Sequence, residues 1–171
     1  MPEKVKELEP PTGLARLALR GPIWIYRFGL GKLLGNRFLE LTHIGRKSGL
    51  ARHTVLEVVR YEPSSGTYYI AVGFGEHSDW YKNILANPHV EVQSGSGHFK
   101  AIAVQLSPEE AGEELVKYSH QHRIAFRELL QFMGYRVDGT DADTRALGQY
   151  MHMFALKPAE SNSTATSTDN T

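Results

Sequence analysis

The feature that most constrains the fold is a series of short β-forming segments separated by turn-forming residues. Residues 38–44 form a first run rich in apolar side chains, and 54–61 and 67–72 follow it after two turns. Pro, Ser and Gly crowd the second turn at 62–66, which is typical of a link between two strands. Three consecutive strands joined by short turns predict an antiparallel meander.

Beyond residue 72, helical and strand patterns alternate. Ser107-Pro108-Glu109-Glu110 has the spacing of a capping box with proline at the first helical position, so a helix is expected to begin there. The other expected elements are a helix over 80–86, a hairpin whose strands centre on 90–92 and 99–106, helices over 124–133 and 141–147, and a final strand over 150–156.

Both ends of the chain differ in character from the middle. A charged leader, 1–13, precedes an amphipathic helical segment, 14–36, in which Arg and Lys residues alternate with Trp24, Tyr26 and Phe28. That mixture suits either packing on a protein core or contact with a membrane surface through 14–34. The Ser- and Thr-rich tail, 159–171, is expected to be disordered because it holds too little apolar surface to offset ordering entropy. One domain, 37–158, remains between them.

Composition excludes several classes of function. The 171 residues include 19 Lys and Arg, 19 Asp and Glu and no Cys. The balanced charge argues against a nucleic-acid partner, and the lack of cysteine removes thiolate chemistry and thiolate metal sites. The start of the chain lacks the layout of a secretory signal, so a cytoplasmic protein is expected. The spacing of the histidines predicts no metal site.

The densest chemical signal is the turn Gly45-Arg46-Lys47-Ser48-Gly49, followed by Arg52. Cations, a hydroxyl and glycine backbone on one tight turn suit an anion such as a phosphate. A solvated hairpin tip would have the same composition, so the turn alone leaves both interpretations open.

A second signal lies in residues 73–83, where a glycine-bearing loop runs into a short helix that begins with aromatic residues. A loop without bulky side chains lets a planar ring approach the backbone, and a helix N-terminus favours negative charge. Trp80 can wall a flat heterocycle, or it can be an ordinary core anchor.

Together these two motifs resemble the deazaflavin-dependent nitroreductase family. The resemblance rests on Gly-Arg-Lys-Ser-Gly-x-x-Arg-x-Thr over 45–54, Trp-Tyr-x-Asn over 80–83 and Ala-Asn-Pro over 86–88. It implies an α+β fold, a split β-barrel of about six antiparallel strands with flanking helices. It also implies coenzyme F-420 as hydride carrier and reduction of a quinone, an enone or a nitro compound.

Carried over by position, the resemblance assigns most of the cofactor contacts to two stretches of the chain. The implied phosphate ligands are Arg46, Lys47, Ser48 and Arg52, and the implied contacts to the deazaflavin are Thr54, Val55, Leu56, Ala71, Gly73, Ser78, Trp80 and Asn83. Two departures from the family pattern concern the ring contacts: Val55 replaces a common proline, and the loop before Trp80 is short.

Several questions stay open at this stage. The proton donor is unassigned, with Tyr118, His120 and Tyr135 as candidates. FMN could replace F-420 on the same cationic turn, and a non-enzymatic carrier of the cofactor or of a lipid-like ligand is the other alternative. A homodimer is expected from the resemblance to such barrels.

Overall fold

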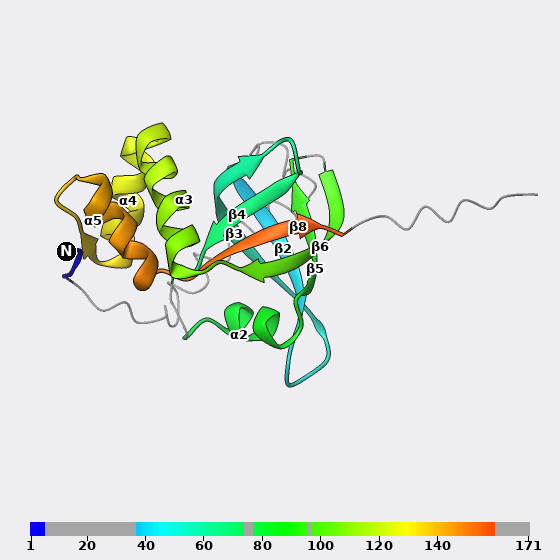
Figure 1. Cartoon of the computed structure of the whole chain (residues 1–171). Helices are drawn as coiled ribbons and strands as arrows, with labels where there is room; N and C mark the ends of the chain where they lie inside the picture. The colour runs from blue at the N-terminus through cyan, green and yellow to red at the C-terminus, as the bar shows by residue number, and fades with distance from the viewer. Residues whose placement is uncertain (6–36, 74–76, 96, 160–171) are drawn as a thin grey trace, which may run out of the picture.

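The computed structural model describes residues 1–5, 37–73, 77–95 and 97–159 (Figure 1). Its strands are β1 (Glu3–Lys4), β2 (Phe38–Ile44), β3 (Ala51–Glu62), β4 (Thr67–Ala71), β5 (His89–Ser94), β6 (Gly97–Gln105), β7 (Tyr135–Arg136) and β8 (Met153–Pro158). Its helices are α2 (Asp79–Ala86), α3 (Pro108–Gln121), α4 (Arg123–Met133), α5 (Asp141–Ala146) and the 3-10 helix η3 (Leu147–Gln149).

Six antiparallel strands close into a barrel in the order β2-β3-β4-β8-β6-β5 (Figure 1). The strands β2, β3 and β4 pair in sequence order, as expected of a meander, and β5 and β6 form the predicted hairpin. The last strand, β8, pairs with both β4 and β6, and β2 pairs with β5. Each of the six strands is therefore paired on both sides. The predicted fold class, a barrel of six antiparallel strands with flanking helices, is confirmed.

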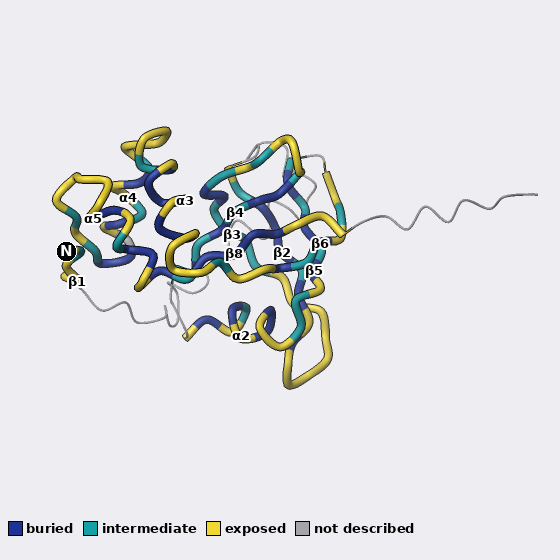
Figure 2. Tube along the Cα trace, in the orientation of Figure 1, coloured by how far each residue is buried: buried dark blue, intermediate teal, exposed yellow. Residues whose placement is uncertain are grey.

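The barrel has an interior core and a second core outside it (Figure 2). The interior core draws on all six barrel strands and on Tyr81 and Ile84 of α2, so α2 is anchored to the barrel. The second core joins Val59 and Met153, on barrel strands, to apolar side chains of α3 and α4 such as Leu115 and Leu130. The helices α3, α4 and α5 thus lie together at one end of the molecule, beside the barrel, and this part is called the helical end (Figure 1).

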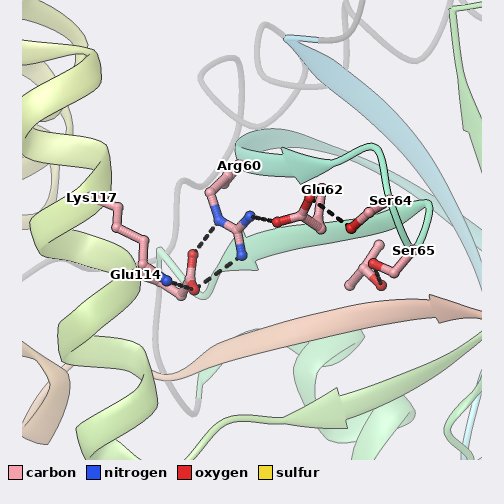
Figure 3. A network of polar contacts seen from close by, with 7 residues as sticks. Arg60, Glu62, Ser64, Ser65, Glu114 and Lys117 are labelled. Carbon is pink, nitrogen blue, oxygen red and sulfur yellow. Dashed lines mark hydrogen bonds and ion pairs between the residues drawn. The ribbon is translucent and has the colours of Figure 1, made fainter.

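A polar network joins α3 to strand β3 (Figure 3). Arg60 Nη2 donates to Glu114 Oε1 at 3.1 Å, and Nη1 donates to Glu62 Oε2 at 2.7 Å. Lys117 Nζ donates to Glu114 Oε1 at 2.9 Å, and the Arg60 guanidinium lies 4.1 Å from the centre of the Tyr69 ring. Burial alone would raise the pKa of Glu114, but the hydrogen bonds from Arg60 and Lys117 outweigh it and hold that pKa below its usual value.

Two glycines allow the helical elements to pack at backbone contact. A Cβ at Gly148 would lie 2.0 Å from the carbonyl oxygen of Pro108, and one at Gly112 would lie 2.4 Å from that of Arg145. Both distances are far below a van der Waals contact. The helix α3 therefore packs against η3 and the end of α5 only because neither glycine carries a side chain.

Most predicted elements are present, with differences at their ends. The predicted capping box is formed, since Glu110 N donates to Ser107 Oγ at 3.2 Å and Ser107 N donates to Glu110 Oε2 at 2.9 Å. The strand predicted from Tyr150 begins instead at Met153, because the N–H groups of Tyr150 and Met151 donate to the carbonyl oxygen of Leu147 in a continuing turn.

The two-stranded ribbon of β1 and β7 was not predicted. Its strands have two residues each, which is too short for any periodic pattern to reveal. The segment predicted as amphipathic over 14–36 and the tail beyond residue 159 lie outside the described residues.

Candidate functional site

The basic turn, residues 45–50 together with Arg52 at the start of β3, joins β2 to β3 and is closed by its own backbone. The N–H of Gly45 donates to the carbonyl oxygen of Leu50 at 2.9 Å, and the N–H groups of Ser48 and Gly49 donate to that of Gly45 at 3.1 and 2.8 Å. Gly49 has a φ of 65°, a left-handed conformation that glycine adopts without a steric penalty. The glycines of the motif therefore serve a compact turn that presents its side chains outward.

Asn83, a buried residue of α2, fastens this turn to the helix. Asn83 Oδ1 accepts two hydrogen bonds from Arg46, one from the backbone N–H and one from Nη1, both at 3.0 Å. The same Nη1 also contacts Asp79 Oδ1 at 3.1 Å. One guanidinium nitrogen of Arg46 is thus engaged within the protein, and its backbone position is fixed relative to α2.

The other end of the Asn83 amide contacts His43, a buried residue of β2. Because the two donors on Arg46 require the amide oxygen on their side, Asn83 Nδ2 faces His43 Nδ1, at 3.1 Å. A nitrogen that accepts this bond carries no proton, so the imidazole is neutral with its proton on Nε2. Burial, together with the positive charges of His53 and Arg52, lowers the pKa of His43 from 6.5 to about 4.

The remaining polar side chains of the turn are exposed. Lys47 and Arg52 form no ion pair within the described part of the chain, and Ser48 Oγ accepts only the N–H of Leu50, at 3.3 Å. At the N-terminus of α2, the buried Ser78 Oγ has no hydrogen-bond partner among the described residues. Among the described residues, two cations without an ion pair at the turn and one hydroxyl without a hydrogen bond at the start of α2 fit a phosphate-bearing cofactor.

The strand register sorts the next candidates into two faces. Arg52 pairs with His43, Thr54 with Leu41 and Leu56 with Leu39, and directly paired residues share a face of an antiparallel sheet. Thr54 and Leu56 therefore lie on the interior face of the barrel with Arg52. Val55 lies on the opposite face, so the structure does not bring it together with its two neighbours.

The candidates that follow β3 are more dispersed. Ser78 precedes α2, Trp80 is its second residue and Asn83 lies in its middle. Half-buried Trp80 packs against the interior core. Gly73 is half-buried in the loop after β4. Ala71 packs in the second core, against the helical end, and so lies apart from the basic turn.

The three proton-donor candidates all belong to the helical end rather than to the basic turn. Tyr118 is buried in the second core, and burial raises the pKa of its hydroxyl to about 12. His120 Nε2 is 2.8 Å from Asp141 Oδ1 at the surface, and Tyr135 lies half-buried in β7. Their roles remain predictions.

The sequence interpretation missed His43. The signal was present, because Leu39, Leu41 and His43 are spaced two apart along β2 and must share the interior face. A histidine in that row is buried, and it needs a polar partner such as Asn83.

Comparison with known proteins identifies the family of this chain. A family model described as F420H(2)-dependent quinone reductase matches residues 20–129. A solved structure described as an F420-H2 dependent reductase (FDR-A) is 24% identical, with a TM-score of 0.50 over 72% of this chain and 96% of that chain.

Two other solved structures have a similar fold. One, described as a domain-swapped dimer, is 22% identical, with a TM-score of 0.50 over 80% of this chain and 100% of that chain. The other, a conserved hypothetical protein from Mycobacterium tuberculosis, is 13% identical, with a TM-score of 0.50 over 78% of this chain and 80% of that chain. The fold is thus shared with a protein of only 13% sequence identity.

Proposed function

The chain belongs to this family of F-420-dependent quinone reductases, so it is an oxidoreductase with coenzyme F-420 as its cofactor, and we propose that its acceptor is a quinone. The family match favours F-420 over FMN, and an enzyme over a non-enzymatic carrier, among the interpretations that the sequence left open. An enone or a nitro compound would require the same hydride transfer and remains the alternative acceptor class.

One observation carries the assignment of the cofactor's position. The basic turn is fixed to α2 by Asn83, which leaves Lys47, Ser48 and Arg52 exposed at the same end of the barrel. A turn that is already ordered loses little conformational freedom when an anion binds. We assign Lys47 and Arg52 as the phosphate ligands, with Ser48 as a further hydrogen-bond donor.

Reduced F-420, when bound, supplies a hydride to the acceptor. The protein must hold the two reactants in contact and keep water away from them. Trp80 and Leu56 are half-buried against the interior core, and Thr54 shares the face of Leu56 on β3, which supports a role in seating the deazaflavin ring. His43 and Asn83 act indirectly in this proposal, since both are buried and position the turn.

The proposal is tested by the affinity of the double variant Lys47→Ala/Arg52→Ala for F-420. Charge-assisted hydrogen bonds contribute roughly 1.5 to 3 kcal/mol each, and at this exposed site we take the lower value for each. The expected loss is therefore about 3 kcal/mol, roughly a hundredfold in Kd. The matched control is Lys100→Ala/Lys157→Ala, which removes two exposed cations from β6 and β8. An unchanged Kd in the first variant would show that the turn does not bind the cofactor.

We also propose that the chain forms a homodimer, which the neighbour described as a domain-swapped dimer supports. Light scattering coupled to size-exclusion chromatography measures the mass directly. A mass of one chain at micromolar concentration would contradict the proposal.

A cytoplasmic location with peripheral membrane contact through 14–34 remains a proposal based on the sequence, because that segment lies outside the described residues. Within the part that the structure describes, none of the helices is long and apolar enough to cross a bilayer. Sedimentation with anionic liposomes, compared between the full chain and a chain lacking residues 1–34, tests the contact. Failure of the full chain to sediment would remove it.

A further inference from the structure

A cavity of about 810 Å3 lies within the helical end, where α3, α4, β7 and α5 meet. Figure 1 shows α4 and α5 at the far side of the molecule from β5 and β6, with α2 and the β2–β3 turn beneath the barrel. The cavity is therefore separate from the basic turn and from the interior of the barrel. Its volume is within the range of sites for small molecules, roughly 300–1,000 Å3.

Three arginines line the cavity: Arg123 and Arg127 of α4, and Arg136 of β7. None of them forms an ion pair or a side-chain hydrogen bond within the described part of the chain. The one carboxylate in the lining, that of Asp141, is engaged by His120 at 2.8 Å. The lining therefore carries three positive charges that the described residues leave unpaired.

Within the described part of the chain, the position of these exposed charges is unfavourable. Arg123 and Arg127 are four residues apart on α4, where like charges repel. Arg123 is also the first residue of the helix, and the first turn of α4 holds no acidic residue. A cation at a helix N-terminus opposes the helix dipole. An anion bound between these side chains would relieve both effects.

The lining also includes apolar side chains, beside polar ones such as Ser119, Gln131 and Thr144. Phe126 and Leu130, one helical turn apart on α4, are buried and belong to the second core, and Val137 lies partly buried beside them. Because a guanidinium group binds a carboxylate or a phosphate through paired N–H donors, the head of a ligand would lie at the arginines. An apolar body would lie on Phe126 and Leu130.

We propose that this cavity binds an anionic amphiphile, a carboxylate or phosphate head on a single alkyl chain. Charge complementarity selects the head, and the buried aromatic and aliphatic floor selects the chain. The site is independent of the cofactor and of the redox step, so it can be tested without turnover.

The test is isothermal titration of the full chain with laurate, and separately with dodecyl phosphate, dodecanol and acetate. We expect saturable binding of laurate. Dodecanol, which lacks the charge, and acetate, which lacks the chain, should each bind at least tenfold more weakly than laurate. The ratio of laurate to dodecyl phosphate affinity identifies the head group. Equal affinities for dodecanol and laurate would overturn the proposal, and so would the absence of binding of both laurate and dodecyl phosphate at millimolar concentration.

Variants place the binding at the arginines. Arg123→Gln/Arg127→Gln is expected to lose at least tenfold in laurate affinity, and Arg123→Lys/Arg127→Lys less than that, while Lys100→Gln/Lys157→Gln keeps full affinity. Far-UV circular dichroism checks that each variant is folded. Unchanged laurate affinity in the first variant refutes this site. If Arg123→Gln/Arg127→Gln also lost F-420 affinity to the same extent, the cavity would belong to the cofactor site instead. The assignment of the turn is tested separately by Lys47→Ala/Arg52→Ala.

Discussion

Replacement of Asn83 by leucine tests whether one buried amide positions the cofactor turn. Leucine is similar in size but cannot hydrogen-bond, so the change strands the backbone N–H of Arg46 and the Nδ1 atom of His43. A buried polar group left without a partner costs about 1–3 kcal/mol. Since the Arg46 contact is only partly buried, we expect the free energy of unfolding to fall by about 2–4 kcal/mol, measured by urea denaturation.

The same change should weaken F-420 binding, because the turn would no longer be held in its binding geometry. The matched control is Asn87→Leu at the end of the same helix, where the side chain accepts only the N–H of His89, at 3.1 Å, near the surface. Asn83→Asp separates the two contacts, since a carboxylate can still accept from Arg46 but cannot donate to neutral His43. If Asn83→Leu destabilises the protein no more than Asn87→Leu and leaves the Kd for F-420 unchanged, Asn83 does not position the turn.

Three further predictions concern stability. Glu114→Gln should lower the free energy of unfolding by about 2–3 kcal/mol in urea denaturation. This is less than the roughly 3–5 kcal/mol lost when one partner of a buried ion pair is removed, because Arg60 still contacts Glu62. No change in the free energy of unfolding would mean that the network does not hold α3. Gly148→Ala should lower the free energy of unfolding by more than about 3 kcal/mol, since overpacking against side chains costs about 1–3 kcal/mol and here the added Cβ meets backbone atoms. Gly97→Ala should be tolerated, because the atom nearest to the added Cβ is 3.5 Å away. Equal melting temperatures of the two variants would refute this prediction. Because burial and nearby cations lower the pKa of His43 from 6.5 to about 4, the unfolded chain binds that proton more tightly, so unfolding free energy should be constant above pH 6.5 and decrease toward pH 4. The decrease should be smaller in His43→Gln, and an equal decrease in both proteins would assign it to other groups.

Local sequence patterns predicted most strands and helices because local signals agree with tertiary ones, whereas the closure of the strands into a barrel was implied by the family resemblance. Alternating apolar residues in β2, turn formers between strands and the capping box at Ser107 each act over a few residues, so pattern and structure coincide. The final strand was displaced because its first two predicted residues continue a turn from Leu147, and no local pattern distinguishes that turn from a strand.

The candidate site was predicted less completely. The motif placed Arg46, Lys47 and Asn83 in the site, but only the structure shows that Asn83 is buried between Arg46 and His43, a contact 40 residues apart in sequence. Such long-range pairing cannot be read from spacing. The opposite faces of Thr54 and Val55 follow from alternation alone and could have been predicted. The cavity at the helical end depends on how α4 and β7 pack, which the sequence does not reveal.

We propose that this protein passes a hydride from reduced F-420 to a quinone. The most direct measurement mixes the full chain with reduced F-420 and a water-soluble quinone under anaerobic conditions, and follows the return of the absorbance of the oxidised cofactor. We expect many turnovers for each protein chain with F-420, and a lower rate with Lys47→Ala/Arg52→Ala. Absence of turnover with quinones, enones and nitro compounds alike, or faster turnover with reduced FMN than with reduced F-420, would contradict it.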